Sequence, residues 1–298
     1  MMKELHTDLS IHFMVSVWSR FDNDTYFYRT MRDDGFMIQN STYYDPWNPE
    51  ARELFYQFAK AAHFDIGVDA LWLDATEPEG FPHENKTIFL GSANQFFNTY
   101  SLETTSAISA GLRRDFPLAQ GRRVFSLTRS SFAGQQRSGA ALWSGDISAN
   151  WDTLRRQVAA SLNYAASGMP YWSVDTGGFF RPVDQYTSPE YLRLLIRWFQ
   201  FSTFIPLFRV HGGASNTELW NYGEETEGII VNSSIALRYR LLPYTYSGFY
   251  RVAKNGYTMQ RLLAFSFPDE SEVHAIADQF MWGPSLLVSP IVQDTDSR

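Results

Sequence analysis

Two acidic residues in aromatic surroundings are the part of this chain best suited to carry out chemistry. Asp74 follows an apolar run that contains Trp72, and Asp146 follows Gly145 a few residues after Trp143. Cleavage of a glycosidic bond requires two carboxyl groups on opposite sides of the anomeric carbon, one to attack and one to pass a proton to the leaving oxygen. Aromatic rings stack on sugar C–H faces, and a dry aromatic site can separate two carboxyl pKa values.

Each of these residues, taken alone, also fits a structural role. Asp74 and Asp146 could each cap the helix that follows, because Asp is favoured at that position. Arg129 could orient a carboxylate or a sugar hydroxyl, or form a salt bridge within the loops. Phe179, next to two glycines, could close over a ligand or be a core residue. An isolated histidine such as His211 is more often structural than catalytic.

Other chemistries fit the sequence less well. The chain has no cysteine and its six histidines are scattered along the sequence, so a zinc site is not expected. A Ser-His-Asp triad would lack its nucleophile elbow, because no GxSxG motif occurs. The net charge of −7 argues against a nucleic-acid partner. No apolar run approaches the ~20 residues of a membrane helix. The first residues do not resemble a signal peptide, because no apolar segment follows them.

The pattern of apolar residues predicts an α/β fold. Short apolar segments alternate with amphipathic ones, which is typical of strand–helix units around a parallel sheet. Helix starts are expected at Asn48 and Ser188, each followed by Pro-Glu. Further helices are expected over 148–167, with Gly168 as the C-cap, and over 234–254, kinked at Pro243. The predicted strands are 11–18, 68–74, 123–128, 140–143, 169–175 and 205–210.

The candidate residues cluster at the ends of these predicted strands. In a (β/α)8 TIM barrel, residues at the C-terminal ends of the strands meet at one rim. A doubly wound sheet would bring them to a crevice instead, but the chain lacks a GxGxxG or Walker loop. The barrel is therefore favoured, and the residues that end or closely follow a predicted strand are Asp74, Arg129, Asp146, Asp175 and His211.

The pattern of apolar and polar residues changes after Gly256. Segments 259–267 and 282–292 are predicted strands with no helix between them, which indicates the beginning of a C-terminal β-sandwich module. We therefore expect a partial barrel over 1–256 and the start of a β domain over 257–298. Both ends of the chain have the character of cut points, so we expect a longer protein.

Four ordered segments resemble glycoside hydrolase family 31, the retaining α-glycosidases. WLDATEPE at 72–79 is similar to the family's nucleophile signature. TRSSFAGQQRSGAALW at 128–143, followed by SGDISANW, is similar to its general-acid region. SGMPYWSVDTGGFF at 167–180 and RWFQFSTFIPLFRVHG at 197–212 match two further blocks of the family. The match runs through nearly the whole chain.

The resemblance implies double displacement. Asp74 would attack the anomeric carbon while Asp146 protonates the departing oxygen, and Asp146 would then activate water. The two carboxyl groups should stand about 5–5.5 Å apart, and burial beside Trp143 and Asp74 should favour the protonated form of Asp146. No metal or organic cofactor is implied. The positions that would line the sugar subsite are Trp18, Trp72, Arg129, Trp143, Phe179 and His211.

The sequences of two segments, ATEPE and YWSVDTGGFF, most resemble those of bacterial α-xylosidases that act on xyloglucan oligosaccharides. An α-glucosidase or α-transglucosylase is the alternative within the family. The resemblance also implies that the first two strands of the barrel are absent, so that six of eight remain. An inactive remnant or a non-catalytic sugar-binding module is therefore the alternative to an enzyme. Compartment and oligomeric state stay open.

Overall fold

The computed structural model describes residues 2–80, 84–117, 123–213, 216–295 and 297. The terminal residues Met1, Asp296 and Arg298 lie outside the described residues. The chain divides into two compact units, Met1–Leu142 and Trp143–Arg298. In the part of the chain that the structure describes, no helix is both long enough and apolar enough to cross a membrane.

A parallel sheet forms the centre of the first unit. Its strands lie side by side in the order β1 (Met14–Trp18), β2 (Ala70–Asp74), β5 (Ser126–Thr128) and β6 (Ala140–Trp143). The register pairs Trp18 with Asp74, Leu73 with Thr128, and Thr128 with Leu142. The C-terminal ends of these strands therefore lie along one edge of the sheet, as expected for a barrel.

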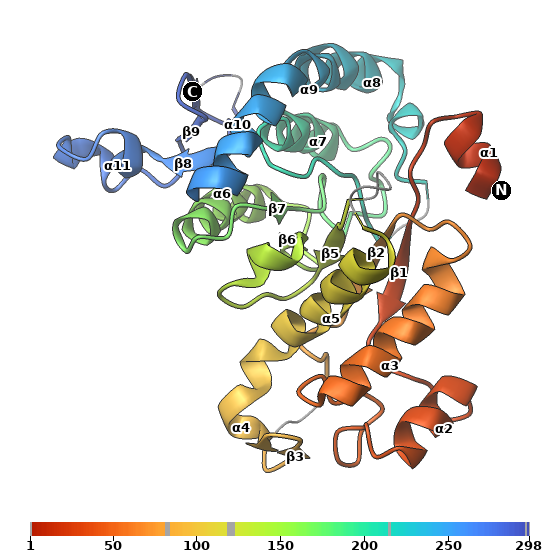
Figure 1. Cartoon of the computed structure of the whole chain (residues 1–298). Helices are drawn as coiled ribbons and strands as arrows, with labels where there is room; N and C mark the ends of the chain where they lie inside the picture. Colours follow the sequence, from red (N-terminus) through yellow and green to blue (C-terminus); the bar gives the residue numbers. More distant parts are fainter. Residues whose placement is uncertain (1, 81–83, 118–122, 214–215, 296, 298) are drawn as a thin grey trace. The chain divides into compact units, whose positions relative to one another are not determined.

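The two faces of β2 differ in burial, as the alternation of side chains along a strand requires. Leu71 and Leu73 are fully buried in the core of the first unit, whereas Trp72 and Asp74 on the other face are half-buried. Helices α3 (Pro49–Ala59) and α5 (Tyr100–Asp115) lie side by side in Figure 1 and contribute buried residues to the same core.

Smaller elements complete the first unit. A π-helical turn, Lys60–Phe64, extends α3, and a two-stranded hairpin precedes α4. The remaining elements are α1 (Met2–Thr7), α2 (Tyr26–Asp33), β3 (Thr87–Ile88), β4 (Gly91–Ser92) and α4 (Ala93–Phe96).

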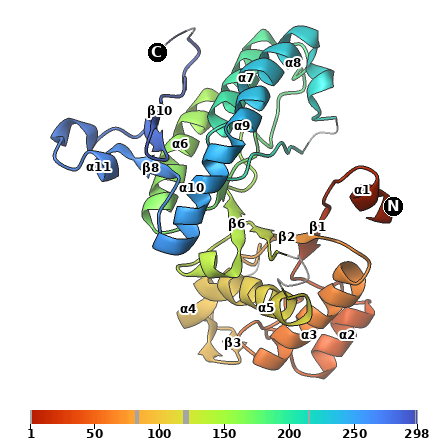
Figure 2. The same ribbon diagram turned by 45° about the horizontal axis from the view of Figure 1, so that its top comes forward.

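Helices dominate the second unit. Figure 2 shows α7 (Pro189–Ser202), α8 (Glu224–Ile230) and α9 (Ala236–Arg240) close together, with a π-helical turn joining α8 to α9. The other helices are α6 (Trp151–Ala166), α10 (Leu242–Asn255) and α11 (Leu263–Ser266). The short strand β7 (Trp172–Ser173) follows α6.

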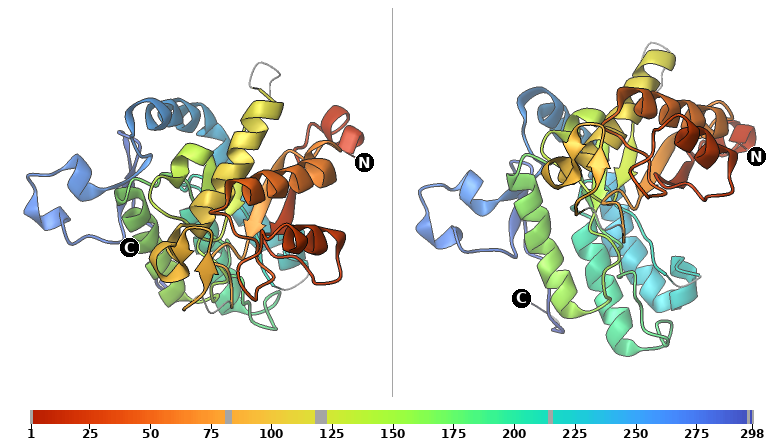
Figure 3. Two further views of the ribbon diagram at one scale, coloured as in Figure 1. Left: turned by 60° about the horizontal axis from the view of Figure 1, so that its bottom comes forward. Right: turned by 90° about the horizontal axis from the view of Figure 1, so that it is seen from below.

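An antiparallel sheet closes the second unit. Its strands are β8 (Gln260–Leu262), β9 (Phe280–Trp282) and β10 (Leu286–Val288), in the order β10-β9-β8. Gln260 anchors this sheet to α6 by a hydrogen bond of 2.8 Å to the Ser161 hydroxyl. Figure 3 shows the C-terminal segment in blue, with the loop around α11 extending away from α10.

The predicted helix ends agree well with the structure. Asn48 and Ser188 cap α3 and α7 through their side chains, and proline occupies the first helical turn in both. The expected kink at Pro243 is a break at Leu241 between α9 and α10. The helix expected from residue 148 begins later, because Asn150 caps it at the Thr153 amide.

Several strand predictions are wrong in extent. Segment 205–210 forms only isolated bridges, from Leu207 to Ser173 and from Val210 to Thr176. Segment 169–175 reduces to β7. Both segments contain a proline, at 170 and 206, which removes a donor from the ladder. The strand expected over 259–267 ends at Leu262, where α11 begins, so a helix does lie between the two predicted C-terminal strands. Segment 282–292 contains only the last residue of β9 and the short strand β10.

A matched pair of glycine substitutions tests the packing of α5 on α3. A methyl group at Gly111 would lie 2.4 Å from the ring of Tyr56, which is fully buried, whereas one at Gly228 in α8 meets nothing within 4 Å. We expect Gly111→Ala to lower the free energy of unfolding by about 1–3 kcal/mol despite its better helix propensity. Gly228→Ala should raise it by up to about 1 kcal/mol.

Urea denaturation followed by circular dichroism measures both changes. Equal effects of the two substitutions would contradict the close crossing of α3 and α5.

Candidate active site

Asp74 lies at the carboxyl end of β2, directly beside Trp18 of β1. Its side chain is 19% exposed, and its Oδ1 accepts a hydrogen bond of 2.7 Å from the amide of Ala75. Residues 76–80 form turns, and the next helix among the described residues begins at Ala93. Asp74 is therefore not a helix cap, and its carboxylate is presented at the edge of the sheet.

Arg129 provides the positive charge beside Asp74. Its Nη1 lies 3.1 Å from Asp74 Oδ1, and its Nε and Nη2 each contact Glu77 at 3.0 Å. Nη2 also donates to Glu79. Burial opposes the charge on Arg129, but the hydrogen bonds to Glu77 and Glu79 outweigh it and raise the pKa of the guanidinium. One cation therefore holds three carboxylates together.

Hydroxyl groups join the turn after β2 to the turn after β5. The hydroxyls of Thr76 and Thr128 are 2.8 Å apart, and the Ser130 hydroxyl donates to the Thr76 carbonyl at 2.8 Å. The amide of Arg129 donates to the Leu73 carbonyl at 3.3 Å. Thr76 and Thr128 are buried, so this network fixes the backbone from which Asp74 and Arg129 project.

Two tryptophans border Asp74. Trp72 is half-buried and lies on the same face of β2, two residues before it. Trp18 is also half-buried, and the guanidinium of Arg20 stacks 4.7 Å from the centre of its ring. These rings bring apolar surface next to the carboxylate.

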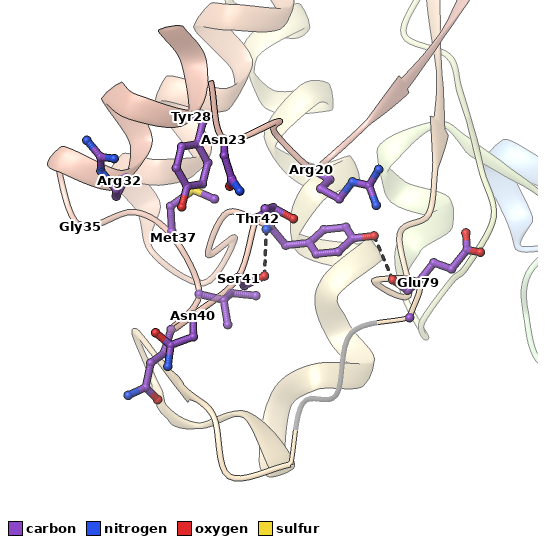
Figure 4. Close-up of a pocket in the computed structure, with 14 residues that line it drawn as sticks. Arg20, Asn23, Tyr28, Arg32, Gly35, Met37, Asn40, Ser41, Thr42 and Glu79 are labelled. Atoms are coloured by element: carbon purple, nitrogen blue, oxygen red, sulfur yellow. Dashed lines mark hydrogen bonds between the residues drawn. The ribbon is translucent and has the colours of Figure 1, made fainter. Parts of the chain in front are cut away.

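A hollow of about 670 Å³ opens beside this edge of the sheet. Figure 4 shows Arg20 and Glu79 at one end of it and Arg32 and Gly35 at the other. Tyr43 also lines it and donates a hydrogen bond of 3.2 Å to the Glu79 carbonyl. Burial raises the pKa of the Tyr43 phenol, which keeps it a donor at neutral pH. The polar lining suits a ligand rich in hydroxyl groups.

In the second unit, backbone hydrogen bonds hold the turn that carries Asp146. The carbonyl of Ile147 accepts from the amides of Phe179 and Phe180 at 2.8 and 3.0 Å, and the amide of Ala149 donates to Phe180 at 3.1 Å. A Cβ at Gly178 would lie 2.6 Å from Ala149 Cα. Glycine is therefore required for this close approach.

Phe179 connects the Asp146 turn to His211. The two rings lie 5.5 Å apart and are tilted by 42°. The amide of Gly213 donates to the Phe179 carbonyl at 3.0 Å. The Asp146 turn, Phe179 and His211 therefore belong to one connected region of the second unit.

Arg181 positions this region and was missed by the sequence analysis. It donates to the carbonyls of Gly178, Thr176 and His211 at 2.9–3.1 Å, and to the hydroxyl of Tyr222. The signal available in the sequence was weak, because an arginine after a Gly-Gly-Phe-Phe turn is normally a surface residue.

A buried ion pair supports Trp143. Arg209 pairs with Asp175, which is completely buried, and the Arg209 guanidinium lies 5.4 Å from the centre of the Trp143 indole. Trp143 is only 1% exposed. The structure thus explains Asp175 and Arg209 as residues that hold the indole in place.

Two expectations for Asp146 are corrected. It does not cap the following helix, because Asn150 does. Its side chain is exposed, so the expected burial beside Trp143 is wrong. The physical reason is the turn at Gly145, whose φ of +77° directs the chain out of the strand end. The expected distance of about 5–5.5 Å between the two carboxyl groups stays a prediction.

Metal-ligating side chains also come together, although the histidines are scattered in the sequence. In the described part of the chain, His6, His12 and Asp69 form a group of three with ligand atoms within 4.8 Å of one another. His12 and Asp69 precede β1 and β2, so this group lies at the opposite ends of the strands from Asp74.

A strand–helix fold with a carboxylate at the carboxyl end of a parallel strand is typical of barrel enzymes. Comparison with family models makes the class specific. Residues 1–248 match the TIM-barrel domain of the glycosyl hydrolases family 31, and residues 256–298 match the C-terminal domain of the same family. The chain belongs to glycosyl hydrolase family 31.

Individual relatives agree with this assignment. The chain is 39% identical to an alpha-xylosidase of Saccharolobus solfataricus over 98% of its length, and 29% identical to alpha-xylosidase A of Aspergillus niger over 93%. A GH31 alpha-xylosidase from a soil metagenome, solved with xylose, superposes on 98% of the chain with a TM-score of 0.91 and 33% identity.

The matched region is a minor part of these proteins. The chain covers 40% of the Saccharolobus enzyme, 45% of the Aspergillus enzyme and 47% of the metagenomic one.

Replacement of Arg129 tests its part in the carboxylate cluster. Arg129→Met should lower the free energy of unfolding by about 1–3 kcal/mol at pH 7, because three carboxylates lose their shared cation. The raised pKa keeps Arg129 charged across the working range. The effect should shrink in high salt, which screens the attraction between Arg129 and the partly exposed Glu77 and Glu79.

The matched control is Arg155→Met, since Arg155 pairs with one exposed aspartate and should contribute less than about 0.5 kcal/mol. Unfolding curves at pH 7 in low and high salt check both variants. An Arg129→Met effect no larger than that of Arg155→Met, or one that salt leaves unchanged, would contradict the ion-pair account.

Proposed function

We propose that this chain is the catalytic part of a retaining α-glycosidase that removes a non-reducing-end α-linked xylose or glucose. The observation that carries the proposal is the Asp74 carboxylate at the end of β2, 3.1 Å from Arg129, in a chain that belongs to glycosyl hydrolase family 31.

Asp74 is the proposed nucleophile. Its carboxylate is supported by one backbone amide and one guanidinium, so its orientation is fixed before a sugar arrives. Attack on the anomeric carbon gives a covalent glycosyl-enzyme. Arg129 is already engaged with three carboxylates, which favours a role in holding Asp74 over direct recognition of sugar hydroxyls.

Asp146 is the proposed acid/base. In the first step it protonates the departing oxygen, and in the second its carboxylate takes a proton from water. The turn at Gly145 and the hydrogen bonds to the Ile147 carbonyl hold its backbone while leaving the side chain accessible. Accessibility suits a group that must exchange protons with both a leaving group and water.

Aromatic side chains supply the proposed sugar contacts. Trp18 and Trp72 flank Asp74 in the first unit, and Phe179 and His211 pack together near the Asp146 turn in the second. Trp143 is buried against Arg209 and would contribute apolar shape. Such rings stack on the C–H faces of a pyranose, while the imidazole can hydrogen-bond a hydroxyl.

Sequence identity to the first relative supports xylose over glucose as the sugar that is removed. The alpha-xylosidase of Saccharolobus solfataricus shares 39% of its aligned residues with the chain, against 31% for neutral alpha-glucosidase C of Homo sapiens. Glucose differs from xylose by a hydroxymethyl group at C5, so the two substrates test the same site with one group added.

Turnover of aryl α-glycosides tests the proposal. The 298-residue chain should hydrolyse an aryl α-xyloside faster than the α-glucoside and release the α-anomer first, as NMR can detect. Asp74→Ala should abolish turnover of both. Asp146→Ala should lower kcat/KM about 10²–10⁴-fold for a substrate with a poor leaving group. The loss should be far smaller for a substrate with a good leaving group, because that group departs without protonation.

Asp152→Ala is the matched control, since this exposed aspartate in α6 pairs with the surface residues Arg155 and Arg156 and its loss should leave rates unchanged. A folded, monomeric chain without turnover would contradict the proposal and favour a non-catalytic sugar-binding module.

The hollow beside Glu79 is the proposed place for the rest of the oligosaccharide. An enzyme that removes the terminal sugar has further sugars only on the leaving-group side. Arg20 and Tyr43 line the hollow, and Glu79 connects it to Arg129. Arg20→Ala should raise KM severalfold for a xyloglucan oligosaccharide and leave KM for an aryl xyloside unchanged. An equal change in KM for both substrates would contradict the proposal that the hollow binds the rest of the oligosaccharide.

A further inference from the structure

We propose that His6, His12 and Asp69 form a binding site for a divalent transition-metal cation, best suited to Zn²⁺. The site is separate from the proposed glycosidase centre, because it lies at the amino ends of β1 and β2 while Asp74 ends β2.

The geometry brings two imidazole nitrogens to one carboxylate. His6 Nε2 lies 2.8 Å from Asp69 Oδ2, and His12 Nδ1 lies 3.1 Å from Asp69 Oδ1. Each nitrogen faces a different carboxylate oxygen, and the ligand atoms of the three side chains all lie within 4.8 Å of one another. A zinc ion with bonds of about 2.0–2.2 Å needs its ligand atoms roughly 3.3 Å apart. Rotation of His12, which is 87% exposed, can bring ligand atoms that lie within 4.8 Å of one another to this spacing.

The carboxylate is held in place before a cation arrives. The amide of Phe13 donates to Asp69 Oδ2 at 2.7 Å, and the amide of Asp69 donates to the Phe13 carbonyl at 2.9 Å. This pair of bonds ties the start of β2 to the segment before β1. Outer contacts of this kind orient ligands in metal sites.

The position of His6 is also fixed by packing. Its helix, α1, crosses the turn before β2, where a Cβ at Gly67 would lie 3.4 Å from Met2 and 3.8 Å from the His6 ring. His12, in contrast, is 87% exposed and can rotate to close on an ion. The site thus has two anchored ligands and one adjustable ligand.

The donor set selects the class of cation. Two imidazoles and one carboxylate suit Zn²⁺ and similar transition metals, whereas Ca²⁺ and Mg²⁺ prefer oxygen ligands alone. Three protein ligands leave a position for water. A neutral imidazole donates from one nitrogen and accepts at the other, so a tautomer change turns the atoms that now face Asp69 into ligands.

Isothermal titration of the metal-free, untagged 298-residue chain with ZnCl₂ tests this site without any substrate. We expect one equivalent of Zn²⁺ to bind, and Mg²⁺ to bind much more weakly. His12→Ala and Asp69→Asn should each weaken binding at least about tenfold. Zinc should also raise the unfolding temperature of the unaltered chain but not of these variants.

His274→Ala is the matched control, because the ring of this exposed histidine faces the Pro268 carbonyl in the second unit, so its loss should leave the titration unchanged. His12 is exposed, so its removal should not unfold the chain, which circular dichroism checks. Absence of saturable one-to-one binding would overturn the site, as would unchanged zinc affinity in His12→Ala. Neither result depends on glycosidase activity.

Discussion

The sharing of Arg129 among Asp74, Glu77 and Glu79 is the constraint on which the first unit's site depends. Three carboxylates at the end of one strand repel one another, and two unit charges 4 Å apart near a protein surface interact by about 4 kcal/mol. A single guanidinium, 13% exposed, offsets this repulsion and fixes the direction of Asp74. The parallel register makes the arrangement possible, because Arg129 follows the strand next to β2.

The second unit fixes its carboxylate in a different way. The turn that carries Asp146 is held by backbone hydrogen bonds to the segment around Phe179. Arg181 then ties that segment to the His211 carbonyl. A nucleophile needs a fixed direction, whereas an acid/base group needs access to two proton partners in turn. The guanidinium beside Asp74 and the solvent exposure of Asp146 fit those two roles.

Local features could be predicted from the sequence, and distant pairings could not. The apolar run before Asp74 and the Pro-Glu pairs after Asn48 and Ser188 have local causes in strand burial and helix capping, and the structure agrees. Partners far apart in the chain, such as Arg209 with Asp175 or His6 with Asp69, depend on which strands become neighbours. The strand predicted over 205–210 is wrong in extent because an apolar pattern takes no account of Pro206, which has no amide donor for the ladder. The exposure of Asp146 depends on one backbone angle at Gly145.

Covalent trapping tests the central claim most directly. A fluorinated α-xylosyl fluoride, whose electron-poor sugar slows breakdown of the glycosyl-enzyme, would be incubated with the 298-residue chain. Mass spectrometry of its peptides would then locate the adduct. A single xylosyl label on the side chain of Asp74 is the expected result. A label on another carboxylate, or hydrolysis that releases the β-anomer and leaves Asp74 unlabelled, would contradict the assignment of the nucleophile.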